Sequence, residues 1–283
     1  PIPEFRGVLI GDFRSFLYPI LDVSVTNIGI FGVNRGTIRN VKLIGVRNDA
    51  NWGITSRTFY YGGLVGINYG VIDNCTNSSD TLSLQGYYNA CIGNFVGKNR
   101  GGTIRKASTS NLLTGSGYVG GIVGRNEAGG TVEDCSCSGY IEYVWTTANR
   151  SMGGLIGYND NATVKNNRFS GKIVWVCEER NKDILPSIGL IVGYNTGGTF
   201  FENDSEDATY HIDCESLYVI IMIWDQSGRV MKKENGQDGW EEYGFSGGGG
   251  GILRFRFFRE LSEFRQRFKD RIEKATKGGA FFV

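Results

Sequence analysis

The sequence has few of the residues that most often carry out catalysis or end helices. Its 283 residues include one histidine, three methionines and four prolines. A single histidine excludes the His-Glu-x-x-His signature of zinc proteases, which needs two. The longest apolar run, LYVIIMIW at 217–224, is far shorter than the ~20 residues of a membrane helix. Basic and acidic side chains number 30 and 29, so the charge balance gives no reason to expect a nucleic-acid partner.

Glycine is abundant instead, with 43 residues, and much of it recurs in a motif. One copy of this motif reads GGLVGINYGVIDNCTN, and another reads GGIVGRNEAGGTVEDC. A constant motif at variable spacing indicates one structural unit joined by loops of different length. The copies are residues 28–41, 62–77, 93–107, 120–135, 153–167 and 189–203.

Each copy reads as short strands rather than as a helix. The apolar runs are brief, rich in β-branched residues and bounded by Gly and Asn. We expect about three strands per unit, wound into one coil of a right-handed parallel β-solenoid with about six coils. Successive coils would stack ~4.8 Å apart, so that equivalent residues form columns. The fold class is therefore predicted to be all-β.

The motif positions suggest structural roles. The glycine two residues before the asparagine would allow a close backbone approach or an unusual backbone angle. The asparagine tolerates left-handed turn geometry, and its amide can bond to the amides above and below it in a ladder. A threonine column follows, and a column of mixed charges accompanies it, which argues against an ice-binding surface. The predicted ladder consists of Asn34, Asn68, Asn99, Asn126, Asn159 and Asn195.

The G-[LI]-[VI]-G-x-N core followed by TI-x-N-C resembles the GLUG-motif repeat. That repeat occurs in large bacterial surface proteins, including filamentous-haemagglutinin-like adhesins and the non-catalytic regions of IgA-specific metallopeptidases. The resemblance covers roughly residues 5–205 and implies a solenoid scaffold at the cell surface. A scaffold is used for many purposes, so it implies no particular activity.

The six cysteines leave two interpretations open. An even number in an extracellular chain would suit disulfides. Cys75 and Cys135 share a motif column, but Ala107 lies in the coil between them, so two coil steps put them beyond bridging distance. We favour small buried hydrophobic residues, an interpretation that also covers Cys91, Cys137, Cys177 and Cys214.

We find no catalytic constellation, cofactor fingerprint or metal site in the sequence. G-x-S-x-G, Walker A and dinucleotide-binding motifs are absent, because the glycines follow the coil period. His211 has apolar and acidic neighbours and suits a structural role. The candidate carboxylates do not fall into one column, so no catalytic carboxylate pair can be argued. They are Glu133, Asp134, Glu178, Glu179, Glu202 and Asp204. We therefore expect a protein that is not an enzyme.

Aromatic residues are the better binding candidates. The position between the motif glycine and asparagine varies, which indicates solvent exposure. Tyr158 and Tyr194 occupy it in adjacent coils and suit a platform for a sugar ring. Tyr143 and Trp175 share a column on the third strand, where same-face stacking within the protein is the simpler interpretation.

The repeat stops near residue 210. The chain then divides into a β-hairpin cap at 211–246, a glycine linker at 247–251, an amphipathic helix at 252–277 and a tail at 278–283. Before the array, residues 1–27 would form entry strands, and the solenoid itself would span 28–210. The apolar stripe of the helix consists of Phe257, Leu261, Phe264, Phe268 and Ile272.

The helix has three interpretations. It could dock on the solenoid or on a neighbouring subunit, it could lie on an anionic membrane, or it could bind nucleic acid. The first is favoured because the stripe is continuous and the other face is charged. Membrane contact is expected only through 252–277.

We expect an extracellular or cell-surface protein that acts by display, adhesion or assembly. A glycan or host-surface molecule and a second subunit are the expected partners. A carbohydrate-active solenoid enzyme, either a polysaccharide lyase or a hydrolase, is the alternative. The chain begins at Pro1 without a leader, so we also expect a mature or trimmed fragment.

Overall fold

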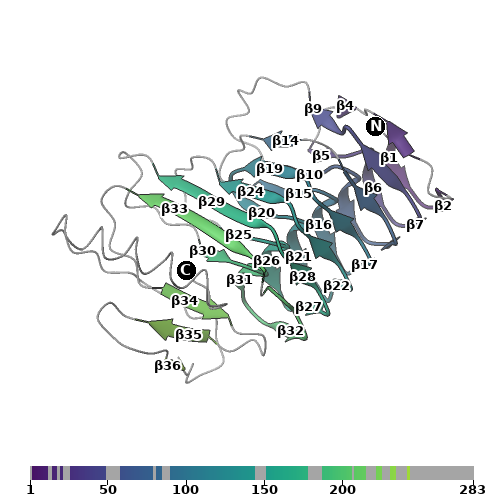
Figure 1. Ribbon diagram of the computed structural model, residues 1–283. Coiled ribbons are helices and arrows are strands. Elements are labelled where there is room, and N and C mark those ends of the chain that lie inside the picture. The colour runs from purple at the N-terminus through teal and green to yellow at the C-terminus, as the bar shows by residue number, and fades with distance from the viewer. Residues whose placement is uncertain are drawn as a thin grey trace.

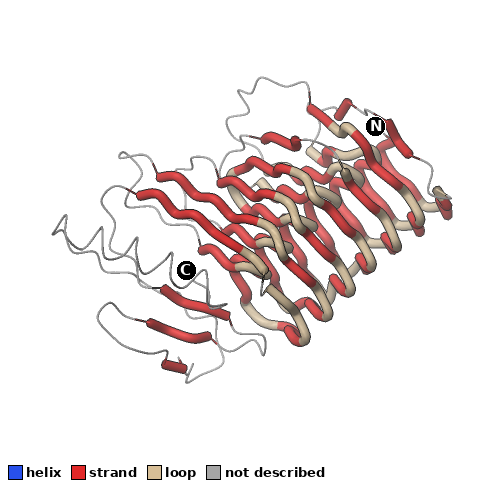
Figure 2. Tube along the Cα trace, in the orientation of Figure 1, coloured by secondary structure: helices blue, strands red, loops and turns tan. Residues whose placement is uncertain are grey.

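The computed structural model describes most of the repeat region and a few strands beyond it. The described residues are 2–11, 15–17, 20–21, 26–48, 58–78, 81–84, 90–143, 151–177, 187–205, 207–214, 221–224, 230–233 and 241–242. In them the chain forms only strands and their connecting turns, as Figure 2 shows. The part of the chain that is described contains no helix long and apolar enough to cross a membrane.

One seven-stranded parallel sheet carries the motif asparagines, and we call it the Asn sheet. Each of its strands comes from a successive turn of the chain. The registers place Asn34 opposite Asn68, and so on to Asn195. In spatial order its strands are β1 (Ile2–Phe5), β6 (Phe31–Asn34), β11 (Val65–Asn68), β16 (Val96–Arg100), β21 (Val123–Glu127), β26 (Ile156–Asp160) and β31 (Val192–Asn195).

A second seven-stranded parallel sheet, the Thr sheet, follows the Asn sheet along every turn. Its central column is buried and aliphatic, from Ile38 to Val164. The threonines flank that column in the predicted register, with Val71 as the exception. Its strands are β2 (Val8–Ile10), β7 (Thr37–Arg39), β12 (Val71–Asp73), β17 (Thr103–Arg105), β22 (Thr131–Glu133), β27 (Ala162–Lys165) and β32 (Gly198–Phe201).

Shorter strands complete the turn. One six-stranded sheet contains β3 (Ser15–Leu17), β8 (Lys42–Ile44), β13 (Thr76–Asn77), β18 (Ser108–Thr109), β23 (Ser136–Cys137) and β28 (Arg168–Phe169). A five-stranded sheet contains β14 (Thr81–Leu84), β19 (Leu112–Gly115), β24 (Tyr140–Tyr143), β29 (Lys172–Cys177) and β33 (Thr209–Cys214), and β4 (Ile20–Leu21) pairs with β9 (Arg47–Asn48). The second six-stranded sheet, which we call the Gly sheet, contains β5 (Asn27–Ile28), β10 (Tyr60–Gly62), β15 (Cys91–Gly93), β20 (Tyr118–Gly120), β25 (Ser151–Gly153) and β30 (Ser187–Gly189).

These sheets form the predicted all-β parallel β-solenoid. About four turns carry the same full set of five strands: β11–β15, β16–β20, β21–β25 and β26–β30. Strands β1–β10 and β31–β33 extend the stack at its two ends, and Figure 1 shows the strands of successive turns lying side by side. The expectation of three strands per unit is wrong. The two extra strands are only two or three residues long and lie at corners, so they leave almost no periodic pattern. The right-handed winding stays a prediction.

The interior is a continuous apolar core between the sheets. It includes fully buried Leu64, Ile72, Phe95, Ile104 and Val132. Burying one such side chain stabilises the fold by ~1.5–3 kcal/mol before conformational entropy is counted. Columns of the same residue type repeat this gain in every turn, which explains why the apolar pair ahead of each motif glycine recurs.

The motif glycine is needed for close packing of the Asn sheet on the Gly sheet. A Cβ on Gly124 would lie 2.3 Å from the backbone nitrogen of Ile92, and one on Gly157 would lie 2.6 Å from that of Val119. Real side chains do not approach backbone this closely. Of the two predicted reasons for the glycine, the close approach is therefore the one that the structure supports.

Left-handed backbone occurs in a different column from the one predicted. The motif asparagines do not have positive φ. The positive-φ column lies at the end of the Thr-sheet strand, with φ between 52° and 56°. Asparagine suits that conformation, but the column also accepts other side chains, so its signal in the sequence is weak. Its members are Asn40, Asn74, Lys106, Asp134, Asn166 and Glu202.

Beyond the solenoid, three strands form a separate antiparallel sheet. They are β34 (Ile221–Trp224), β35 (Val230–Lys233) and β36 (Glu241–Glu242). The linker at 247–251, the helix at 252–277 and its apolar stripe lie outside the described residues. The predicted domain limits, a cap at 211–246 among them, stay predictions.

Candidate binding surface

The candidate surface lies on the outward face of the Asn sheet, in the column between motif glycine and motif asparagine. Register places Lys98 beside Arg125, Arg125 beside Tyr158, and Tyr158 beside Tyr194. All four side chains are partly exposed, as the variation in the sequence predicts. Along the stack, the column therefore passes from cationic to aromatic.

Tyr158 and Tyr194 are stacked, as the sequence predicts, and a third ring extends the stack. Their ring centroids are 5.4 Å apart and the planes differ by 20°. Tyr118, from strand β20 of the Gly sheet, lies 5.2 Å from Tyr158 at an interplanar angle of 23°. Tyr158 thus has both ring faces covered. A sugar ring could stack on the outer face of Tyr194, but it could meet Tyr158 only at its edge.

Arginine and lysine side chains pack against tyrosine rings on this surface. The guanidinium carbon of Arg125 lies 4.8 Å from the ring centroid of Tyr158 and 5.9 Å from that of Tyr118. The Lys98 ammonium lies 5.0 Å from the ring centroid of Tyr60. Cation–π contacts at partly exposed positions stabilise by ~0.5–1 kcal/mol. The column is therefore a connected cation–aromatic cluster.

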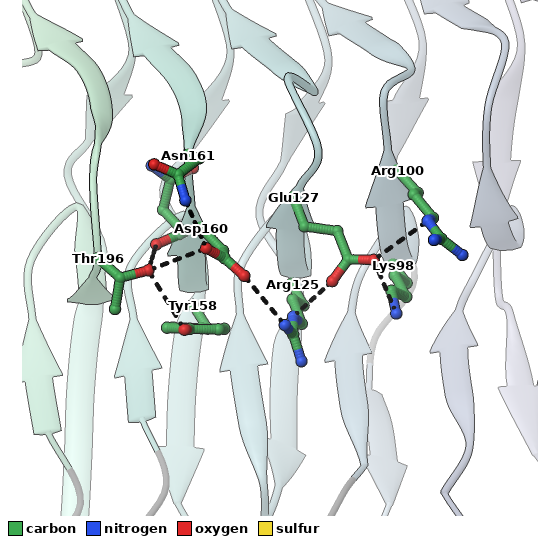
Figure 3. Close-up of polar contacts among 9 residues, drawn as sticks. Lys98, Arg100, Arg125, Glu127, Tyr158, Asp160, Asn161 and Thr196 are labelled. Atoms are coloured by element: carbon green, nitrogen blue, oxygen red, sulfur yellow. Dashed lines mark hydrogen bonds and ion pairs between the residues drawn. The ribbon is translucent and has the colours of Figure 1, made fainter. Parts of the chain in front are cut away.

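Glu127 holds the cationic end of this cluster together. One carboxylate oxygen lies 2.9 Å from Lys98 Nζ and 3.5 Å from Arg100 Nε, and the other lies 2.8 Å from Arg125 Nε. Only 11% of its side chain is exposed. Figure 3 shows Glu127 between the three cations. Three ion pairs hold this carboxylate in a fixed position.

Asp160 and Thr196 connect the cluster to its aromatic end. Arg125 Nη2 donates to Asp160 at 3.2 Å, and the Thr196 hydroxyl donates to the same carboxylate group at 3.2 Å. The Tyr158 and Thr196 hydroxyls lie 3.2 Å apart and share a hydrogen bond. Figure 3 shows this continuous path from Lys98 to Thr196. The Arg–Tyr cluster, as we call it, consists of Lys98, Arg100, Arg125, Glu127, Asp160, Thr196, Tyr118, Tyr158 and Tyr194.

The charge states of the cluster follow from these contacts. Burial alone would lower the pKa of Arg125, but Glu127 and Asp160 raise it, and the net shift is upward. Burial raises the pKa of Tyr194, and the neighbouring Tyr158 raises it further. Arg125 is therefore cationic and Tyr194 neutral at any physiological pH. The surface offers hydrogen-bond donors and acceptors at fixed positions.

The second predicted aromatic pair is confirmed only in its backbone position. Tyr143 in β24 lies opposite Trp175 in β29. Their side chains lie outside the described residues, so a binding role stays a prediction. The predicted helix residues Phe257, Leu261 and the rest of the stripe also lie outside them.

Sequence reasoning missed the polar half of the cluster. Glu127 and Asp160 occupy the position directly after the motif asparagine, and their register is visible once the repeats are aligned. Tyr118 could have been found in the same way, because it stands two residues before the Gly-Gly pair of its repeat. The ion pairs themselves depend on rotamers, which the alignment does not give.

The asparagines of the motif form the predicted ladder rather than a binding site. Each side-chain amide donates to the next asparagine oxygen at 2.7–2.9 Å. The first five are fully buried. Such a ladder satisfies buried amides with one another along the solenoid. Its members therefore stabilise the scaffold and are not available to a ligand.

Comparison with known families assigns the repeat. Residues 58–83 and 115–141 match the sequence model of the GLUG motif. The chain contains GLUG repeats. Each matched GLUG segment spans a Gly-sheet strand, an Asn-sheet strand, a Thr-sheet strand and the short strand that follows, and it ends within a strand of the five-stranded sheet, so that the motif describes most of one turn of the solenoid. No curated protein and no solved structure matches the chain.

Proposed function

We propose that this protein is a structural or adhesive β-solenoid that is extracellular or located at the cell surface. It acts by display, binding or assembly, without catalysing a reaction. The GLUG repeats and the solenoid fold support a repeat scaffold. The filamentous-haemagglutinin-like adhesins and the repeat regions of IgA-specific metallopeptidases that the motif resembles suit the same surface role.

One observation carries the proposal. In the described columns, side chains bond to or stack on the side chains of the neighbouring turns. The asparagine amides bond along the stack, and the tyrosine rings stack on one another. Columns of this kind hold neighbouring turns together in a regular stack. Such a stack suits a spacer or a platform that presents a ligand site away from the cell.

The Arg–Tyr cluster is the proposed contact with a glycan or another host-surface ligand. It combines the outer face of Tyr194, which suits an apolar sugar face, with the polar groups of Arg125 and Asp160, which suit sugar hydroxyls. Its side chains are held by several contacts each, so little conformational entropy would be lost on binding.

A glycan array tests this contact. Wild-type protein should bind a subset of glycans, and Tyr194→Ala should lose that binding. Tyr140→Ala is the matched control, because Tyr140 is also a partly exposed tyrosine beside a lysine but lies in the five-stranded sheet. Absence of binding by the wild type, or equal loss in both variants, would remove the Arg–Tyr cluster as the ligand site.

The alternative is a carbohydrate-active enzyme, and one feature favours it. Glu127 and Asp160 lie opposite each other on neighbouring strands, with Arg125 between their carboxylates. Against this, both oxygens of Glu127 are bound to cations, which leaves a poor general base. Release of reducing ends or unsaturated sugar ends from a polysaccharide panel, lost in Glu127→Gln, would establish the enzyme instead.

Assembly through residues 252–277 remains part of the proposal. Light scattering after size-exclusion chromatography should give a smaller assembly when the chain is truncated at Gly247. An unchanged number of subunits would assign any self-association to the solenoid rather than to the terminal segment.

A further inference from the structure

The five-stranded sheet brings together two cysteines that are distant in sequence. Cys177 is the last residue of β29, and Cys214 is the last residue of β33. These strands are parallel neighbours, and their register places Cys177 opposite Cys214. Figure 1 shows β29 and β33 side by side at the end of the stack away from the N-terminus. Strands β30, β31 and β32 lie between the two cysteines in sequence.

The spacing of paired strands suits a disulfide. Neighbouring strands are ~4.8 Å apart, and bridged cysteines have Cα atoms about 4.4–6.8 Å apart. Residues in direct register lie on the same face of the pleat, so both cysteines belong to the face that also carries buried Ile173. Bridged Cβ atoms are about 1 Å closer than in an ordinary parallel pair. Because both cysteines end their strands, that adjustment does not disturb a hydrogen-bonded interior.

The other four cysteines are not arranged in this way. All four are buried, as the sequence predicts. Cys137 lies between Thr109 and Phe169 in its sheet. Cys91 lies between Tyr60 and Tyr118 in its own sheet. Cys75 and Cys135 are separated by the turn that contains Ala107. Among the strand pairings that the structure describes, β29 with β33 is the one that matches cysteine with cysteine.

We propose that Cys177 and Cys214 form an intrachain disulfide that ties β33 to β29. Two thiols lose two electrons and two protons to form the S–S bond. The electrons pass by thiol–disulfide exchange to a small-molecule or protein disulfide, which is reduced to two thiols. Of the proposed function, this inference uses only the oxidising surroundings of a surface protein.

The bond has a specific structural consequence. It closes a covalent loop around the last turn of the solenoid, including β31 and β32. Tyr194 of the Arg–Tyr cluster lies within that loop. Such a loop restricts the unfolded chain and holds the terminal strand in place, at the end of a stack where strands otherwise fray.

Thiol counting on the folded full-length chain tests the proposal. The protein is equilibrated in a glutathione redox buffer, denatured under acid quench and alkylated. We expect four alkylated cysteines per chain, and a peptide pair joining Cys177 to Cys214 that separates on reduction. Six alkylated cysteines, or a bond between other cysteines, would overturn the proposal. Because the buffer supplies the oxidant and no ligand is involved, this result is independent of the glycan array.

Variants separate a bond from simple packing. Cys177→Ala and Cys214→Ala should each leave five alkylated cysteines, whereas Cys75→Ala should leave three and retain the linked peptides. Dithiothreitol should lower the melting temperature of the wild type and leave that of the Cys177→Ala/Cys214→Ala double variant unchanged. An equal response of the two proteins to dithiothreitol would show that the cysteines act only as packing residues.

Discussion

Two columns cross the stacked turns of this solenoid, one inside it and one outside. The inner column is the asparagine ladder, with one residue type, fully buried side chains from Asn34 to Asn159 and a hydrogen bond at each of its five steps. The outer column, on the Thr sheet, alternates in charge along Arg39, Asp73, Arg105, Glu133 and Lys165. Two of its steps are ion pairs, Asp73–Arg105 at 2.9 Å and Glu133–Lys165 at 2.7 Å.

The difference follows from what can be stacked every ~4.8 Å. An amide has both a donor and an acceptor, so identical amides satisfy one another and the column can repeat one residue. Identical charges on neighbouring turns repel each other, so this charged column is stabilised by alternating. A buried amide that lacks a hydrogen-bond partner destabilises the fold far more than an exposed charge that lacks an ion-pair partner. Substitutions should therefore be severe inside the solenoid and mild outside it.

The largest expected effect comes from the close contact that allows the interior to form. In Gly124→Ala the new Cβ would lie 2.3 Å from the Ile92 backbone nitrogen, so the Asn and Gly sheets must separate. We expect a loss of ~3 kcal/mol or more of unfolding free energy, measured by urea denaturation, or failure to fold.

Gly129→Ala is the control for that substitution. Gly129 has a φ of +75°, but its Cβ would meet nothing within 4 Å. Alanine there should cost only ~1–2 kcal/mol of left-handed strain. If both variants lost the same stability, backbone conformation rather than close packing would explain the motif glycine.

The ladder itself should show a difference between its middle and its end. Asn126→Ala removes the acceptor for Asn99 and the donor for Asn159, and we expect ~2–4 kcal/mol of destabilisation in the same assay. Asn195 bonds to one ladder neighbour only, so Asn195→Ala should cost ~1 kcal/mol. Equal effects at the two positions would mean that the ladder bonds do not act through their buried partners.

Alkaline pH should destabilise the interior through its thiols. Burial raises the pKa of Cys135 and Cys137 to about 12, above the ordinary value of 9.0. A raised pKa means that stability is complete below the unfolded-state pKa and is lost as pH rises toward the folded-state pKa. Between pH 9 and 11, burial of each thiol should lower the free energy of unfolding by roughly 2–3 kcal/mol. Urea titrations under reducing conditions should show a shallower loss in Cys135→Ala/Cys137→Ala, and parallel curves would contradict this.

Aligning the repeats was sufficient to predict the solenoid, the asparagine ladder and the Tyr158–Tyr194 stack. Each depends on residues that recur at the same motif position, where stacking makes neighbours of them. The corner strands could not be predicted, because strands such as Thr76–Asn77 are too short to show alternation. The left-handed column was missed since Lys106 and Glu202 break its pattern of Asn and Asp.

The candidate surface was predicted less completely than the fold. The motif position that varies between repeats identified Tyr158 and Tyr194. Glu127 and Asp160 belong to the surface because their side chains form ion pairs with Arg125. Such contacts join different motif positions on neighbouring strands. Alignment by motif position therefore does not reveal them.

The smallest expected effect is on the outer column. In Asp73→Asn, Arg105 loses an ion pair in which 45% of its side chain is already exposed to solvent. Water and salt screen such a pair, so the unfolding free energy should fall by less than ~1 kcal/mol, and by less still in 1 M salt. A double-mutant cycle with Arg105→Gln measures the coupling directly. A coupling as large as the cost of Asn126→Ala would show that the charged column stabilises the turns as strongly as the buried ladder does. The expectation that substitutions destabilise the protein more in the interior than on the surface would then be wrong.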